Sequence, residues 1–182
     1  MTDQRAPRRD AQRNRARLVE AAAKAFREEG FGASVNTIAG DAGVNVATLY
    51  RHFPAKEDLI DAVLDAVLEP LATARDRALA VDRPGETLAT FVREAVRLQA
   101  ANRGLVDVVK RQPSGSNVRA RLREPAGAIV APLVERAHRD GELRADFGPE
   151  DVLVALQMLG SLADLPVAAD RYVDVVLRGL RR

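Results

Sequence analysis

The side chains best suited to chemistry lie in one stretch, residues 34–56, and they are hydrogen-bonding and cationic groups. Hydroxyl groups such as that of Tyr50 can bond to phosphate oxygens, while Arg51 supplies positive charge. Short side chains in this stretch let its backbone approach the base edges and thymine methyl groups of DNA. These properties predict a surface that binds double-stranded DNA. The candidate contact residues are Ser34, Asn36, Asn45, Val46, Ala47, Thr48, Tyr50, Arg51, His52 and Lys56.

Two short helices have to position these groups. Residues 35–42 carry apolar side chains at spacings of three and four, as one face of a helix does. Gly43 can adopt a positive φ and end that helix. Ser34 is the expected amino-terminal cap of that helix, and Asn45 is a good cap for a second helix over residues 46–53. Two short helices that cross at such a turn form a helix-turn-helix, whose second helix can enter a DNA major groove.

Within the second helix, Leu49 and Phe53 form the inward pair, and Val46 lies at the edge of the same stripe or is exposed. An alternative is that Tyr50 and His52 are ordinary half-buried packing residues of a small helical domain. DNA binding is the favoured interpretation, because the hydroxyl groups, the basic side chains and the turn glycine converge on one surface.

The order and spacing of these residues resemble the DNA-binding domain of TetR-family transcriptional regulators. The resemblance runs without a gap over about residues 13–65. The residues that carry it are Ala22, Phe26, Glu29-Gly30-Phe31, Ser34-Val35-x-x-Ile38-Ala39, Ala42-Gly43-Val44, Thr48-Leu49-Tyr50-Arg51-His52-Phe53 and Lys56-Glu57-x-Leu59. The rest of the chain matches in length, in helical character and in the stretch Gly141-Glu142-Leu143-Arg144-x-Asp146.

This resemblance implies an all-α protein with about nine helices, in which a three-helix DNA-binding domain precedes a larger helical domain. The expected divisions are residues 1–9 as a basic disordered arm, 10–55 as the helix-turn-helix domain and 56–182 as the effector-binding and dimerisation domain. The implied function is that of a sequence-specific regulator, in the first instance a repressor, whose operator affinity changes when a small hydrophobic effector binds. The alternatives are a helical ligand-binding or scaffold protein that does not act on DNA and, less favoured, an enzyme.

Charge and composition agree with a nucleic-acid partner. Residues 1–56 contain ten Lys and Arg against six Asp and Glu, although the whole chain has a net charge of only +2. Arginines are dense in the amino-terminal arm, where Arg8, Arg9 and Arg13 are expected to contact phosphates or reach into a minor groove. The alternative is a merely solubilising tail. The chain has no cysteine and no signal peptide, so a cytoplasmic protein is expected.

The remaining helices are predicted from apolar periodicity and turn residues. The first should begin near Asp10 and end at Gly30, and another should start near Lys56. Ala55 stands where the family usually has a capping residue, which should weaken that start by about 0.5–2 kcal/mol. Pro70 should kink or divide this helix, either as a hinge or only to follow the core. Further helices are predicted over residues 86–101, 102–112, 118–138, 149–163 and 168–180.

The last two predicted helices carry more apolar surface than one core face needs. Such a surplus usually marks a partner surface. The resemblance implies a homodimer formed through residues 149–180, which would address a pseudo-palindromic operator. The alternative is that the surplus only contacts the central helices.

Catalytic and metal-binding patterns are missing from the sequence, which holds two histidines far apart and no phosphate-binding glycine loop. We therefore expect no enzyme activity, no metal and no cofactor. The effector pocket that the resemblance implies can be assigned only by polar or flexible residues among apolar ones. The candidates are Gln99, Asn102, Arg103, Gln157 and Met158. Each of them also fits a helix-surface or gap-filling role.

Overall fold

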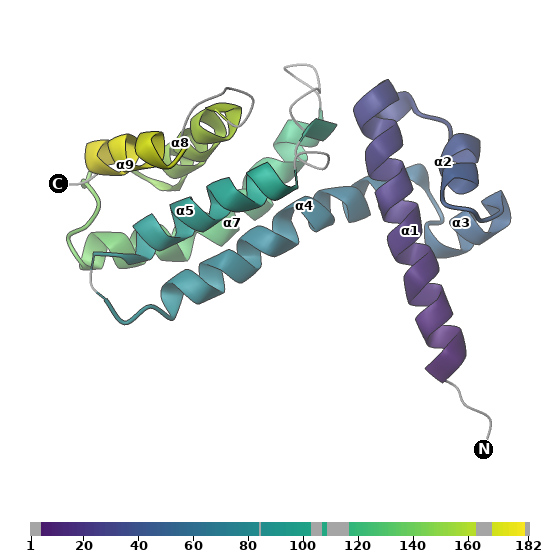
Figure 1. Ribbon diagram of the computed structural model, residues 1–182, viewed down its shortest axis with the longest axis horizontal. Coiled ribbons are helices and arrows are strands. Elements are labelled where there is room, and N and C mark those ends of the chain that lie inside the picture. Colours follow the sequence, from purple (N-terminus) through teal and green to yellow (C-terminus); the bar gives the residue numbers. More distant parts are fainter. Residues whose placement is uncertain (1–4, 84, 103–106, 109–116, 163–168, 181–182) are drawn as a thin grey trace. The chain divides into compact units, whose positions relative to one another are not determined.

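A computed structural model describes residues 5–83, 85–102, 107–108, 117–162 and 169–180 of the chain. Its elements are α1 (Arg5–Glu29), the 3-10 turn η1 (Gly30–Gly32), α2 (Val35–Asp41), α3 (Val46–His52), α4 (Lys56–Leu79), α5 (Thr87–Ala101), α7 (Asn117–Arg139), α8 (Pro149–Ser161) and α9 (Ala169–Leu180). The all-α prediction is confirmed, with eight α-helices in the described residues (Figure 1). The predicted helix over residues 102–112 lies almost wholly outside the described residues.

The chain divides into two compact units, Met1–Val67 with Gly104–Ser114, and Leu68–Arg103 with Gly115–Arg182. The division falls inside α4, whereas the functional boundary was predicted after residue 55. The reason is that the first turns of α4 pack into the first unit, where Leu59 is fully buried.

The first unit has a small core built from four helices. α1 contributes Leu18 and Phe26, α2 contributes Ile38, and α3 contributes Leu49, all of them fully buried. The helix predicted to begin near Asp10 begins at Arg5, so residues 5–9 of the expected disordered arm are helical. Arginine and alanine favour helix, and a proline in the first turn costs no hydrogen bond because amides there have no partner within the helix.

Prolines inside two helices do not divide them. α4 continues through Pro70 to Leu79, and α7 contains both Pro125 and Pro132. Each proline removes one backbone donor, yet each helix continues past its prolines as a single element. Among the described helices, none is long and apolar enough to cross a membrane.

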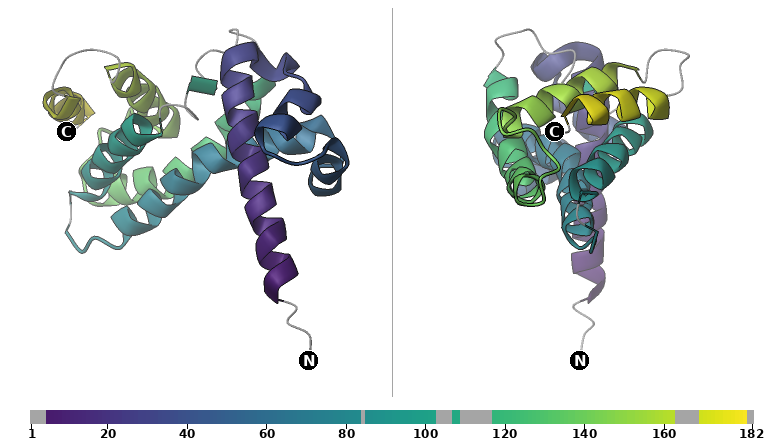
Figure 2. Two further views of the ribbon diagram at one scale, coloured as in Figure 1. Left: turned by 45° about the vertical axis from the view of Figure 1, so that its right-hand side comes forward. Right: turned by 90° about the vertical axis from the view of Figure 1, so that its left-hand side faces the viewer.

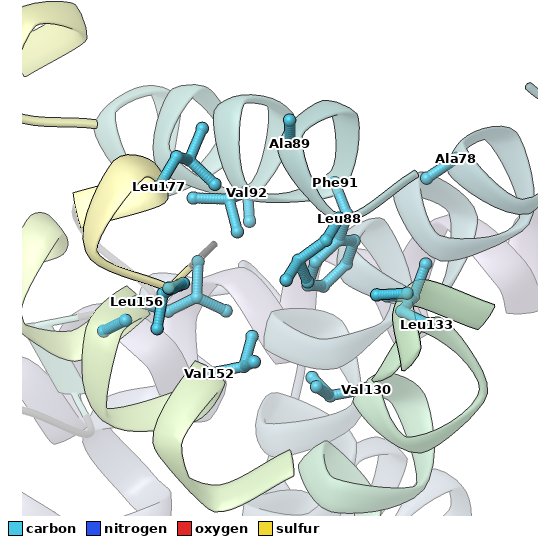
Figure 3. Packing of buried hydrophobic residues seen from close by; sticks show 14 of the residues in the cluster. Ala78, Leu88, Ala89, Phe91, Val92, Val130, Leu133, Val152, Leu156 and Leu177 are labelled. Carbon is cyan, nitrogen blue, oxygen red and sulfur yellow. The ribbon is translucent and has the colours of Figure 1, made fainter. Parts of the chain in front are cut away.

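The second unit is organised around α5, which packs against α7, α8 and α9 (Figures 1 and 2). Figure 3 shows Leu88 and Phe91 of α5 close to Val130 and Leu133 of α7 within one apolar cluster. A carboxyl group is buried among the described residues of this unit. The carboxylate of Glu142, in the turn after α7, accepts a 3.4 Å hydrogen bond from the backbone N–H of Leu88, in the first turn of α5.

Candidate nucleic-acid interface

The turn between α2 and α3 sets the crossing of the two helices. Gly43 adopts a φ of +65°, a conformation that costs other residues strain. The backbone N–H of Val44 donates to the carbonyl of Ala39 at 3.0 Å, which closes the end of α2 as in a Schellman motif. Ala39 is fully buried, so the helices approach each other closely at this small side chain.

Both predicted caps are present. The Ser34 hydroxyl accepts a hydrogen bond from the N–H of Asn36 at 3.2 Å, and the Asn45 side-chain oxygen accepts one from Thr48 at 2.8 Å. These bonds satisfy amides that have no partner within their short helices. They also fix the orientation of two polar side chains that were predicted to meet DNA.

The two faces of α3 differ sharply. Leu49 and Phe53 are buried as predicted, whereas 45% of the Tyr50 surface is exposed. Of the other predicted contact residues, Ser34, Asn36, Asn45, Ala47 and Arg51 are exposed, and Val46, Thr48, His52 and Lys56 are half-buried. The fold therefore gathers all ten around α2, α3 and the start of α4, with six of them, Tyr50 included, clearly open to a partner.

His52 points partly inward. Its Nε2 atom is buried without a hydrogen-bond partner, and its ring lies 6.5 Å from that of Phe53. The packing role that was kept as an alternative for His52 thus has direct structural support, whereas exposed Tyr50 does not share it.

Lys56 makes a contact that the sequence did not indicate. Its Nζ atom donates to the backbone carbonyl of Ala33 at 2.6 Å, across 23 residues of chain. An ammonium group carries three N–H donors, so two remain for another acceptor. The contact ties the start of α4 to the residue that precedes Ser34.

The start of α4 is also better supported than its sequence suggested. Asp58 accepts a 2.8 Å hydrogen bond from the backbone N–H of Ala55. This is the reciprocal half of a capping box, in which the third residue of a helix reaches back to the cap. It offsets part of the loss expected from an alanine at the cap position.

Two arginines of α1 belong beside the helix-turn-helix rather than to a free arm. The Arg15 guanidinium lies 5.1 Å from the centre of the Phe53 ring. An Arg17 nitrogen lies 2.5 Å from where a Cβ on Gly43 would be. Spacing in the sequence could have identified both arginines. Arg15 precedes the buried Ala22 by two helical turns, and Arg17 precedes the buried Ala21 by about one turn. Each arginine therefore lies on the same helix face as a core residue.

In the second unit, the four described candidate effector residues do not gather at one place. Gln99 is half-buried between α5 and α8, and its amide donates to the carbonyl of Leu156 at 3.4 Å. Asn102 instead bonds back to its own helix, at Leu98. Gln157 and Met158 lie on the exposed face of α8, and Arg103 lies outside the described residues.

Gly160 of α8 lies beside the end of the Gln99 side chain. A Cβ on Gly160 would collide with the Gln99 side-chain oxygen.

Among the described residues, no group of three or more acidic, histidine or cysteine side chains could hold a metal ion.

Comparison with known proteins matches both parts of the chain. The family model for bacterial regulatory proteins of the tetR family matches residues 18–63. The model for the C-terminal domain of SbtR-like transcriptional regulators matches residues 83–182. Curated relatives include HTH-type transcriptional regulators from Staphylococcus aureus strains, 45% identical over 67 residues. That stretch is 36% of this chain and 36% of each of these relatives.

Solved structures match over nearly the whole length. A TetR transcription regulatory protein from Mycobacterium vanbaalenii is 35% identical, with 96% of this chain and 99% of that chain covered and a TM-score of 0.60. The regulator SCO0520 from Streptomyces coelicolor is 32% identical, with 92% and 98% covered and a TM-score of 0.60. With both halves matched, the chain belongs to the TetR family of bacterial transcriptional regulators, DNA-binding proteins that are not enzymes.

Proposed function

We propose that this regulator is a repressor that binds a pseudo-palindromic operator as a homodimer and changes its operator affinity when a small hydrophobic effector binds. In this proposal residues 10–55 read DNA, and residues 56–182 dimerise and bind the effector. The observation that carries it is the contrast between the buried Leu49 of α3 and Phe53 at its C-cap, and an open polar face that includes Tyr50.

The exposed groups divide by chemistry into two roles. Tyr50 and Arg51, with the hydroxyl of Ser34, suit phosphate oxygens, because they combine hydrogen bonding with charge. Asn36 and Ala47 suit base edges, since an amide can pair with adenine and a methyl side chain can contact thymine. Phosphate contacts would orient α3, and base contacts would select the sequence.

The proposed dimer surface is supported by exposed apolar side chains on the last two helices. The exposed fractions are 55% for Val154 and 62% for Met158 on α8, and 41% for Tyr172 and 61% for Val175 on α9. Each pair is three or four residues apart and so lies on one helix face. Large apolar side chains on neighbouring helices suit a second copy of the same surface.

The proposed effector class follows from the second unit's core, which is mainly apolar around α5. Gln99 is its half-buried polar group between α5 and α8, and such a group can orient a ligand that is otherwise held by apolar contacts. An effector that favours one conformer by roughly 1–3 kcal/mol would change operator affinity about five-fold to a hundred-fold.

The test is a binding titration against random duplex DNA at several salt concentrations, with light scattering to give the mass of the complex. We expect weak binding that falls steeply as salt rises, because phosphate contacts release counterions, and two protomers per duplex. Absence of binding even at low salt would overturn the proposal and favour a helical ligand-binding or scaffold protein.

A further inference from the structure

The first half of α1 presents one continuous exposed face. Arg9, Gln12, Arg13, Ala16 and Arg17 are all exposed, and their spacings of three and four place them on neighbouring positions of a helix. Three of the five are arginines, and none is acidic. We call these five residues the basic face of α1.

Nothing within the described part of the first unit stabilises this half of the helix by burial. Among the described side chains of α1, the first buried one is Leu18, although Arg15 before it lies over the buried ring of Phe53. Arginines four residues apart on a helix repel one another. A surface with this cost is suited to an anionic partner.

The basic face is continuous with the helix-turn-helix. Its last member, Arg17, lies against Gly43 in the turn before α3. One turn further on, Ala21 is buried, where α1 packs on the domain. Figure 1 and the left view of Figure 2 show the first half of α1 extending past α2 and α3. The arginines therefore lead away from the proposed DNA-reading surface along one helix.

We propose that the basic face of α1 binds the phosphate backbone of duplex DNA beyond the base pairs that α3 reads. This inference rests on the proposed function. Insertion into the minor groove, expected for a flexible arm, does not fit a helix, because an α-helix is roughly 10–12 Å wide and the minor groove about 6 Å. The arginines are spaced by about 6 Å along the helix axis, so Arg9 and Arg13 can meet separate phosphates.

Asp10 moderates this surface. Its carboxylate forms an ion pair with Arg13 on the exposed side of the helix, where such a pair contributes little to stability. Its negative charge is placed to weaken the attraction between Arg13 and a phosphate. Removing that charge should strengthen DNA binding, which is the opposite of the effect expected from removing an arginine.

The experiment measures affinity for two duplexes, a selected operator and the same operator extended by about one helical turn of random sequence at each end. Wild-type protein should bind the longer duplex several-fold to about ten-fold more tightly at low salt. The double variant Arg9→Gln/Arg13→Gln should lose this difference while keeping its affinity for the short duplex. Its salt slope on the long duplex should fall by about 0.9 for each lost phosphate contact.

Matched variants make the result specific. Arg97→Gln/Arg139→Gln removes two exposed arginines of the second unit and should retain the wild-type length dependence, whereas Asp10→Asn should increase it. Equal length dependence in wild type and Arg9→Gln/Arg13→Gln, or an equal loss on both duplexes, would overturn the inference while leaving the proposed function intact. A wild-type protein that binds neither duplex would overturn both.

Discussion

Each of the two units has its own apolar core, and in the first unit long-range polar contacts also hold the surroundings of the helix-turn-helix in place. In the first unit, polar groups join segments far apart in the sequence, as Lys56 does with the carbonyl of Ala33, and Arg15 lies over the ring of Phe53. In the second unit, the helices around α5 share a large apolar cluster, with Gln99 as a polar tie to α8. Hydrogen bonds and cation–π contacts fix the positions of particular side chains. An apolar core, in contrast, only has to be filled to the right volume, which many sequences can do.

Because of this difference, we expect substitutions in the two units to affect different properties of the protein. Changes in the second unit's core should act mainly on the free energy of unfolding. Changes around α3 should act mainly on DNA affinity, at a smaller cost in stability.

The largest expected effect is that of Phe91→Ala. Phe91 is fully buried in the cluster around α5, and truncation of such a ring costs about 3–5 kcal/mol. Urea unfolding followed by circular dichroism measures the loss. Arg97→Ala, at an exposed position of the same helix, should change stability little. A loss for Phe91→Ala no larger than that of its control would show that this core is not what holds the second unit.

Gly43→Ala should cost about 1–2 kcal/mol, because alanine is strained in the left-handed region where Gly43 lies. The new methyl group would also displace the Arg17 guanidinium, so DNA affinity should fall with stability. Gly40→Ala is the matched control, since Gly40 is helical and a Cβ there meets nothing within 4 Å. If both alanine variants unfold at the same urea concentration, the turn does not require glycine.

Lys56→Met tests the link between the first unit's contacts and its DNA surface. It removes the bond to Ala33, which should cost about 0.5–1.5 kcal/mol. It also removes a charge, so the salt slope of DNA binding should fall by about 0.9 per protomer, equally on all sequences. A salt slope unchanged from wild type would show that Lys56 contacts no phosphate and serves only to bond with Ala33.

The smallest expected effect lies in the second unit, at Asp146. Its hydrogen bonds from the exposed Arg144 guanidinium, at 2.7 and 3.0 Å, lower the pKa of the Asp146 carboxyl below its ordinary 3.8. A lowered pKa adds stability above the ordinary value, and this contribution is lost as pH falls through the folded pKa. NMR titration should show a midpoint below 3.8 that returns toward it in Arg144→Gln.

The parts of the fold that sequence reasoning predicted are local. The caps Ser34 and Asn45, the turn glycine Gly43 and the inward pair Leu49 and Phe53 depend on neighbours within a few residues. Their chemistry can therefore be read from spacing alone.

The features that the sequence did not predict depend on contacts between segments that are far apart in the chain. The bond from Lys56 to Ala33 spans 23 residues, and no periodicity signals it. Gln157 and Met158 stood among apolar residues of α8, but only the packing of α5 and α7 decides which side of α8 is exposed. The start of α1 was also misplaced, near Asp10 in place of Arg5, because helix propensity alone marks a helix end poorly.

The most direct test of the central claim is selection of bound duplexes from a random pool by wild-type protein and by two single variants. Because Ala47 is exposed on α3 and is proposed to meet a base edge, Ala47→Gln should change the preferred sequence at one or two positions of each half-site. Tyr50→Phe, which removes only a proposed phosphate contact, should bind more weakly with an unchanged preference. The same enriched sequence from wild type and Ala47→Gln, or no enrichment at all, would contradict the assignment of α3 as the reading helix.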